Sequence, residues 1–365
     1  MQPVTTAIPW FEPQLDADDI EAVRAAAASG FVNEGPANRA FEADLRTFFD
    51  VPYAVTTPSG TTALALALMA HGIGPGDHVL IPAVTFIGTA SAVRLAGATV
   101  RFADVDPDTF VMRTDVLDRY GHPSLKAVMP VHLTGRAVDM DPLNAWAAER
   151  GLVVIEDAAE ALGGRNASGW LGTQSHAGCF SLAPTKIITS GQGGFVLTRD
   201  RATCEQLVRL RDHGRLSRAS DEHPVTGYNF KVTDLQAALA RSQWRKLPAR
   251  IARVKAIDTL YQEALADCPQ LHFPARPPHG YLMWPDFTSP VRDWVVQAMR
   301  ARNITLRPYW PALHLQPAYR MAADLPGAER ACQEACWLPC APAITDDQVI
   351  QVADHLRDIL GSIRL

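Results

Sequence analysis

The chain carries a lysine in a setting that suits covalent chemistry. Lys186 lies in the stretch SLAPTKIITSGQGG, residues 181–194, after a short apolar segment and before Gly191, Gly193 and Gly194. A lysine amine that is partly deprotonated can form a Schiff base with a carbonyl group. The glycines allow a tight turn and a close approach of the backbone to a ligand. A lysine taken alone is far more often a solvated surface charge, so this stretch indicates chemistry only together with other motifs.

Two carboxylates end an apolar run in the segment IEDAAEALGG, residues 155–164. A carboxylate buried at the end of a strand, as Asp157 would be, costs several kcal/mol unless it has a cationic partner. A protonated pyridine nitrogen would be such a partner, and the contact would keep a pyridoxal ring electron-poor. An aspartate that caps a helix gives the same local pattern, and this alternative stays open on the segment alone.

The segment PSGTTAL, residues 58–64, has the composition of a phosphate site. It places small and hydroxyl side chains at the start of a predicted helix, where backbone N–H groups and the helix dipole attract anions. The sequence has no GxxxxGK[ST] motif, so the segment is not a nucleotide-binding P-loop. A plain helix cap explains the segment equally well by itself.

Each of these motifs adjoins a predicted strand. The run LVVIED is almost wholly apolar, which is typical of a parallel sheet with helices on both faces. The alternation of strands and helices predicts a doubly wound α/β sheet, with Asp157 and His132 at the edge where ligands collect. We expect strands at 53–57, 78–82, 99–105, 126–132, 152–157, 178–183 and 194–200, and helices at 61–71, 88–97, 139–151 and 201–214.

The last third of the chain differs from the rest, with clustered prolines and short elements. We expect a long helical stretch over 232–265 that is broken near Pro248, and a domain boundary there. Residues 1–247 would form a large domain, and residues 248–365 would form a small one. We expect the first 25 or so residues to pack on the small domain.

Three of the six cysteines, Cys332, Cys336 and Cys340, recur every four residues. This spacing is compatible with a metal site, but we favour one face of a helix that ends at Pro339, and we expect no metal. The cysteines are scattered through a long chain, which fits reduced thiols in the cytoplasm better than a framework of disulfides.

Charge and hydropathy disfavour other classes of protein. The net charge is −5, with 39 acidic against 34 basic residues, and binding to nucleic acid requires a basic face. We therefore expect no nucleic-acid partner. No apolar run approaches the roughly 20 residues that span a bilayer, and the N-terminal residues lack the basic and apolar regions of a signal peptide. We expect no membrane segment.

Nine segments, in order, resemble the DegT/StrS family of sugar aminotransferases, which are pyridoxal-phosphate enzymes of the aspartate aminotransferase fold, fold type I. The resemblance implies an α/β fold with a mainly parallel sheet flanked by helices in a large domain, and a smaller α+β domain at the C-terminus. The segments cover nearly the whole chain: SGFVNEGP with FEADL, SGTTAL, IGPGDHVLIPAVTF, AGATVRFADVDPDTF, KAVMPVHLTG, VVIEDAAEALG, SLAPTKIITSGQGG, GYNFKVTDLQAAL and RPYWPALHLQPAY.

The resemblance implies roles around the cofactor, pyridoxal 5'-phosphate. Lys186 would bind the cofactor covalently and then move protons, and Asp157 would hold the pyridine nitrogen. Phe86 would stack on the cofactor ring, a contact worth about 1 kcal/mol beyond burial, and Glu160 would lie beside that ring. The phosphate would be held by Gly60, Thr61 and Ser181, with Thr62 nearby.

Two further segments concern the partner subunit and the substrate. Asn229 matches an asparagine that reaches the cofactor phosphate of the neighbouring subunit, which implies a homodimer with shared active sites. Arg307 could hold the carboxylate of the amino donor by a bidentate pair, or a nucleotide phosphate. The segment RPYWPALH resembles the border of the substrate pocket, and its candidate substrate contacts are Arg307, Tyr309, Trp310 and His314.

The resemblance implies transamination in two half-reactions, with glutamate as the expected amino donor. A nucleoside-diphosphate 4-keto-6-deoxyhexose is the leading acceptor, giving an amino sugar for polysaccharide or secondary-metabolite biosynthesis. An aminocyclitol ketone or another keto sugar is the alternative. A pyridoxamine-dependent sugar dehydratase would have lost Lys186, and a non-catalytic regulator would have lost the cofactor residues, so both are disfavoured. His176, Leu182 and Gln192 depart from the commoner family pattern and leave the subfamily open.

Overall fold

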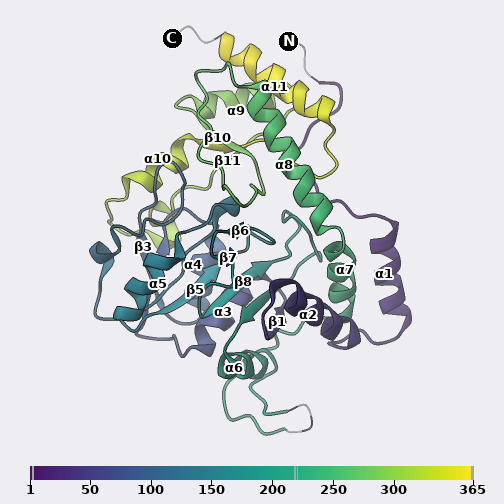
Figure 1. Ribbon diagram of the computed structural model, residues 1–365, viewed down its shortest axis with the longest axis vertical. Coiled ribbons are helices and arrows are strands. Elements are labelled where there is room, and N and C mark those ends of the chain that lie inside the picture. The colour runs from purple at the N-terminus through teal and green to yellow at the C-terminus, as the bar shows by residue number, and fades with distance from the viewer. Residues whose placement is uncertain (2–3, 218, 220, 363–365) are drawn as a thin grey trace.

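A seven-stranded sheet forms the centre of the molecule (Figure 1). The computed structural model describes residues 1, 4–217, 219 and 221–362. Among the described strands of this sheet, only β9 runs opposite to the other six, so the predicted mainly parallel α/β sheet is confirmed. In spatial order the strands are β1 Tyr53–Thr57, β9 Gly194–Thr198, β8 Ala177–Ser181, β5 Val153–Asp157, β4 Leu125–Val128, β2 His78–Pro82 and β3 Thr99–Ala103.

The middle of this sheet is covered on both faces. Every residue of β8 and β9 is buried, and successive side chains of a strand point to opposite faces. Helix α3 contacts β1, β5, β8 and β9. Residues Ala63–Leu68 of α3 are all buried, as in a helix that is apolar all round. The helices that follow the strands are α3 Gly60–Ala70, α4 Ile87–Leu95, α5 Met140–Glu149 and α6 Arg201–Arg211.

The strand predicted at 126–132 is shorter in the structure. β4 ends at Val128, and the chain then leaves the ladder apart from one isolated bridge between Val131 and Asp157. Pro130 has no backbone N–H to donate to a neighbouring strand, which accounts for the early end. The segment nevertheless stays beside β5, and this places the following turn next to the carboxyl end of that strand.

A small antiparallel sheet lies beside the large one, towards the top of Figure 1. Its strands are, in spatial order, β10 Asp286–Thr288, β12 Ala335–Trp337 and β11 Arg307–Pro308. The predicted helix break is confirmed, because α7 Asp234–Trp244 and α8 Leu247–Ala264 are separate and Pro248 lies in the first turn of α8. A domain boundary at 247/248 stays a prediction. The remaining helices of this half are α9 Arg292–Arg300, α10 Pro326–Glu334 and α11 Asp346–Gly361.

The N-terminal segment runs beside the small sheet before the first helix begins. Ile8 makes a parallel bridge with Ile304, and the ring of Trp10 lies 5.1 Å from that of Trp284 and 5.9 Å from that of Trp337. Helix α1 then packs on α7. The elements not yet given are α1 Ala17–Ala28, α2 Pro36–Phe49, the hairpin β6 Arg165–Asn166 and β7 Gly169–Trp170, and the 3₁₀ helices η1 Leu117–Tyr120, η2 Leu133–Gly135, η3 Leu313–Leu315 and η4 Pro317–Tyr319.

The prediction of one helical face through Cys332, Cys336 and Cys340 is wrong. Helix α10 ends at Glu334, and Cys336 lies in β12. Because β12 pairs with β10 on one side and β11 on the other, its backbone is drawn into an extended conformation. The six cysteines are free thiols. Within the described part of the chain, no three His, Cys, Asp or Glu side chains are grouped as metal ligands.

Hydropathy of the helices bears on the question of a membrane segment. Among the described residues, no helix combines the length and the apolar character that crossing a bilayer requires.

Candidate active site

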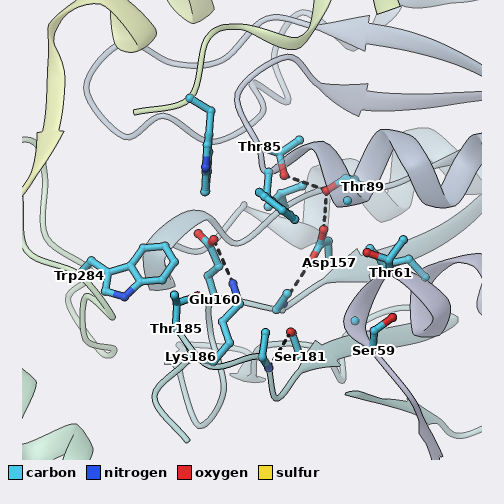
Figure 2. A pocket seen from close by; sticks show the side chains of 18 of the residues that line it. Ser59, Thr61, Thr85, Thr89, Asp157, Glu160, Ser181, Thr185, Lys186 and Trp284 are labelled. Atoms are coloured by element: carbon cyan, nitrogen blue, oxygen red, sulfur yellow. Dashed lines mark hydrogen bonds and ion pairs between the residues drawn. The ribbon is translucent and has the colours of Figure 1, made fainter. Parts of the chain in front are cut away.

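One pocket brings the three sequence motifs together (Figure 2). Asp157 is the last residue of β5, Ser181 is the last residue of β8, and Ser59 and Gly60 follow β1. These three strands point the same way, because β1 and β8 are both antiparallel to β9 and β5 is parallel to β8. Side chains at one edge of the sheet therefore converge, as they do in ligand sites of α/β sheets.

Lys186 lies in the loop between β8 and β9. A backbone hydrogen bond from Leu182 N to Gly193 O, 2.8 Å long, closes the base of this loop. Lys186 Nζ donates to Glu160 Oε1 at 3.2 Å and lies 5.1 Å from the centre of the Trp284 ring, within range of a cation–π contact. The side chain is only 10% exposed. A largely buried amine is therefore held between a carboxylate and an indole face.

Asp157 is a buried carboxylate whose hydrogen-bond donors are both neutral. Thr89 Oγ1 donates to its Oδ2 at 2.7 Å, and Ala159 N donates to its Oδ1 at 3.1 Å. Burial raises the pKa of Asp157 above its ordinary value, although the two hydrogen bonds and the charge of Lys186 act against this rise. Among the described residues none forms an ion pair with Asp157. Because a buried charge needs a cationic partner, Asp157 is suited to hold a cationic group of a ligand.

Glu160 connects Lys186 to a neighbouring turn. Its Oε1 accepts from Lys186, and its Oε2 accepts from Thr134 N at 3.0 Å. The residue is buried. Each carboxylate oxygen thus has its own donor, and the negative charge is matched by the lysine rather than left for a ligand.

The start of α3 forms the anion-binding side of the pocket. Ser59 caps the helix: its hydroxyl accepts from Thr62 N, and Thr62 Oγ1 accepts from Ser59 N. The first N–H groups of a helix have no partner inside it, and those of Gly60 and Thr61 lie at the pocket. A Cβ atom on Gly60 would come within 2.8 Å of Ser181 Cβ. Glycine therefore lets the helix start approach Ser181 closely enough to share one anion.

Aromatic side chains form the outer part of the pocket. Phe86 is 50% exposed, and its ring lies 5.7 Å from that of Trp310. Trp10 lines the pocket as well, with the Arg307 guanidinium 4.8 Å over its ring. Arg307 is exposed and makes no ion pair with any residue that the structure describes. The mouth of the pocket thus offers flat apolar faces and one positive charge.

Two predicted substrate contacts do not reach the pocket. Tyr309 is buried, and its hydroxyl donates to Asp286. His314 is buried too, with Nε2 3.2 Å from Glu329 Oε1. Trp310 lines the pocket, whereas Tyr309 beside it is held in the interior by its bond to Asp286. We correct the set of candidate substrate contacts accordingly, to Arg307 and Trp310.

Three other predicted residues also lie outside the pocket lining. The hydroxyl of Thr62 is used in the helix cap, so it is not free for a ligand. Asn229 is exposed in its own chain, and its contact with a neighbouring subunit stays a prediction. His132 is fully buried, with Nε2 2.9 Å from Glu156 Oε2, as in a structural histidine.

The sequence reasoning missed Thr89, Trp10 and Trp284. Thr89 lies one helical turn after Phe86 at the start of α4, so the spacing of these two residues is a signal that could have been used. Trp10 and Trp284 belong to segments far from the motifs, and nothing in their own neighbourhood indicates a pocket. They reach it only because the N-terminal segment and the small sheet fold over the edge of the large sheet.

Known proteins match this chain along nearly its whole length. The model of the DegT/DnrJ/EryC1/StrS aminotransferase family matches residues 13–357. The chain is similar to DesV of S. venezuelae at 30% identity, with a TM-score of 0.92 over 99% of this chain and 100% of that one. It is similar to the aminotransferase TlmJ from Streptoalloteichus hindustanus at 30% identity, with a TM-score of 0.93 over 98% and 99%. It is also similar to DesI, crystallised in the presence of its TDP-sugar product, at 30% identity and a TM-score of 0.90 over 99% and 94%.

Proposed function

The chain belongs to the DegT/DnrJ/EryC1/StrS aminotransferase family, and we propose that it transfers an amino group from an amino acid to a keto sugar. Enzymes of this family use pyridoxal 5'-phosphate or its amine form. The observation that carries the proposal is that the amine of Lys186 shares one pocket with Asp157, a buried carboxylate that lacks a cation. A covalent anchor and a partner for the ring nitrogen are the two groups that this cofactor requires.

The pocket residues fit pyridoxal phosphate. Asp157 suits a protonated ring nitrogen, because it is buried and forms no ion pair among the described residues. The first turn of α3 and the hydroxyl of Ser181 suit the phosphate, and Gly60 keeps that space open. Phe86 offers a half-exposed ring face beside them. We propose as cofactor contacts Gly60, Thr61, Phe86, Asp157, Glu160, Ser181 and Lys186.

The residues of the chain would handle protons and orient the reactants. When bound, the cofactor supplies an electrophilic carbonyl and an electron sink. Lys186 Nζ is placed to take up and return a proton inside the pocket, with Glu160 Oε1 as its acceptor. Help of this kind typically contributes about 10²–10⁴-fold to the rate. Asp157, fixed by Thr89 and Ala159, would keep a proton on a ligand nitrogen by its negative charge.

For the acceptor we propose a nucleoside-diphosphate 4-keto-6-deoxyhexose, with glutamate as donor. DesI was crystallised with a TDP-sugar product, and this likeness supports a nucleotide-linked sugar here. The free guanidinium of Arg307 supports an anionic substrate, since it can pair with a carboxylate or a phosphate. The indole faces of Trp10 and Trp310 beside it suit the apolar face of a sugar ring. An aminocyclitol ketone is the alternative acceptor.

We also propose a homodimer in which Asn229 completes the site of the neighbouring subunit. Asn229 is exposed outside its own pocket, and the apolar side chains of Phe86 and Ile87 are exposed at the pocket mouth, where a second subunit would cover them. The six free thiols favour a reducing compartment.

Trapping of the cofactor tests the covalent anchor. Protein purified with pyridoxal phosphate should be yellow, and borohydride should fix the cofactor on the peptide that contains Lys186. Lys186→Ala should trap none and should lose turnover by at least about 10³-fold. If the wild type traps no cofactor, or the variant keeps its turnover, the proposal is wrong.

A panel of acceptors tests the substrate. Nucleotide-linked 4-keto sugars, free keto sugars and aminocyclitol ketones should be assayed with glutamate and with glutamine. We expect the highest kcat/KM for a nucleotide-linked sugar with glutamate. A preference for an aminocyclitol ketone would replace the leading acceptor by the alternative.

Mixed dimers test the shared site. Neither Lys186→Ala nor Asn229→Ala should be active alone if Asn229 serves the partner's pocket. Random pairing of the two variants should restore about a quarter of the wild-type activity, since half of the dimers would then contain one intact site. No recovery, in a mixture shown to exchange subunits, would place Asn229 outside the neighbouring site.

A further inference from the structure

The turn that follows β4 contains an unusual backbone conformation. Thr134 has φ 53° and Gly135 has φ 101°, so both lie in the left-handed region. That region is easy for glycine but costly for a β-branched residue such as threonine. A conformation of this kind persists only where the surroundings over-determine it, and it is found most often at functional sites.

Buried contacts hold this turn in place. Arg136 Nη1 donates to Thr134 Oγ1 at 2.8 Å. The same guanidinium makes two 2.7 Å hydrogen bonds to Asp286, one to each carboxylate oxygen. Asp286 belongs to β10 of the small sheet, and both charged side chains are buried. The threonine hydroxyl is thus clamped by a bidentate ion pair that joins the two sheets, the most directional kind of charged contact.

The segment before β10 is fastened to the same turn. Met283 N donates to Thr134 O at 2.8 Å. A Cβ atom on Gly135 would lie 2.1 Å from Tyr281 O, so only glycine allows this close approach. Tyr281 in turn donates its hydroxyl to Leu162 O at 2.7 Å. The backbone of residues 281–283 is therefore fixed against the turn, immediately before Trp284.

The turn consequently controls both neighbours of the lysine amine. On one side, Thr134 N donates to Glu160 Oε2, and the other oxygen of that carboxylate accepts from Lys186. On the other side, Trp284 follows the fastened segment and presents its ring to Lys186 Nζ. Figure 2 shows the amine bonded to Glu160, with the Trp284 ring on the far left of the view.

We propose that the turn of Thr134 and Gly135, clamped by Arg136 and Asp286, is the device that positions Glu160 and Trp284 around the Lys186 amine. Thr134 and Arg136 are positioning residues, because they act through Glu160 and Trp284 and do not line the pocket themselves. The inference rests on the proposed function in taking Lys186 as the reactive amine. The proposed arrangement itself concerns only the surroundings of that amine in the cofactor-free protein.

Chemical labelling of Lys186 tests the proposal without any cofactor or substrate. The full-length, cofactor-free protein is treated at one fixed pH with a limiting amount of an amine-acylating reagent, and the modified peptide is quantified by mass spectrometry. Glu160 holds the amine by a charge-assisted hydrogen bond that must break before the amine can attack the reagent. Glu160→Gln weakens that bond and sets the largest expected increase in labelling, about tenfold.

Thr134→Gly is the critical variant. It removes the clamped hydroxyl and relieves the left-handed strain, so the protein should melt no lower than the wild type. The carboxylate should nevertheless be held less firmly, so its hydrogen bond to the amine should weaken and Lys186 should label about threefold faster. Arg136→Lys, which keeps the charge but not the bidentate geometry, should act in the same direction and serves if Thr134→Gly does not fold.

Arg292→Lys is the matched control. Arg292 is another buried arginine of the small-sheet region, but its bonds go to Cys332 O and Ala335 O, away from the turn. It should change the melting temperature and leave the labelling rate of Lys186 unchanged. The proposal is overturned if Thr134→Gly and Arg136→Lys both label at the wild-type rate, or if Arg292→Lys labels as fast as they do. A labelling change in a protein that fails to trap pyridoxal phosphate would instead overturn the proposed function alone.

Discussion

The pKa values of two buried aspartates, Asp157 and Asp286, are shifted in opposite directions. In the pocket, burial raises the pKa of Asp157, and the hydrogen bonds from Thr89 and Ala159 and the charge of Lys186 do not offset this rise. At the junction of the two sheets, burial acts on Asp286 as well, but the charges of Arg136 and Arg276 outweigh it and hold the pKa of Asp286 below its ordinary value.

The contrast separates a structural charge from a functional one. Asp286 receives hydrogen bonds from Arg136, Arg276 and Tyr309, so its charge is satisfied within the chain. Asp157 keeps a charge that the chain does not neutralise, which lowers the stability of the protein alone and can be recovered when a cationic ligand group binds. Burial by itself does not identify a site; burial without a counter-charge does.

The largest effect on stability should come from Asp286→Asn. The substitution keeps the shape but leaves the buried Arg136 guanidinium without its ion-pair partner, while Arg276 keeps its pair with Asp258; breaking a buried pair in this way typically costs about 3–5 kcal/mol. Urea unfolding of the cofactor-free protein would measure it. A loss below about 1 kcal/mol would mean that the junction is not held by this charge, and the contrast with Asp157 would fail.

Asp157→Asn should have the opposite sign. Removing an uncompensated buried charge should raise the free energy of unfolding of the cofactor-free protein by about 1–2 kcal/mol. The same variant should lose transamination, since a neutral amide cannot hold a proton on a ring nitrogen. Lower stability in the absence of cofactor would show that Asp157 is satisfied within the chain after all.

The pH dependence should sharpen the same contrast. Between the ordinary carboxyl pKa of about 3.9 and its raised value in the fold, the folded protein keeps a proton on Asp157 that the unfolded chain has released. Stability from this group therefore falls as the pH rises through that window. The advantage of Asp157→Asn over wild type should grow as the pH rises through that window and then level off. Asp286 has the opposite pH dependence. Its contribution to stability is present above about pH 4 and is lost as the pH falls through its depressed pKa.

The smallest effect on stability should come from Arg307→Ala. Arg307 is exposed at the pocket mouth and has no carboxylate partner among the described residues, so its loss should change the free energy of unfolding by less than about 0.5 kcal/mol. The KM for the substrate whose anion it binds should rise by about tenfold. Comparing the KM of the donor with that of the acceptor would identify which anion that is. Unchanged values for both would remove Arg307 from the site.

The large sheet, and the ends of its strands that line the pocket, could be predicted from the sequence because the sequence patterns that indicate them are local. Apolar strands, helix patterns and the residues that follow Asp157 and Ser181 all lie within short segments, and parallel strands bring their carboxyl ends together. The antiparallel insertion of β9 changed none of this.

The junction and the outer pocket were not predictable in the same way. Asp286 and Trp284 belong to a region of short strands without clear periodicity, and their partners Arg136 and Lys186 are far away in sequence. Tyr309 and Trp310 illustrate the difficulty: one of these adjacent residues is buried and the other lines the pocket, and only a distant partner such as Asp286 decides which is which. The spacing of Cys332, Cys336 and Cys340 was misleading for a similar reason. It suggested a helix, but the pairing of β12 with β10 and β11 makes the chain extended at Cys336.

The bridge between Ile8 and Ile304 has a consequence for how the chain folds. Together with the pairing of β1 with β9, it makes many contacts non-local, and folding slows as the mean sequence separation of contacts grows. The large sheet can form once residue 198 has been synthesised, but the wall that carries Trp10, Trp284 and Arg307 must wait for the last third of the chain. During synthesis the lysine loop is thus present before its enclosure, and the apolar edge that will become the pocket mouth is transiently open to chaperones or to aggregation.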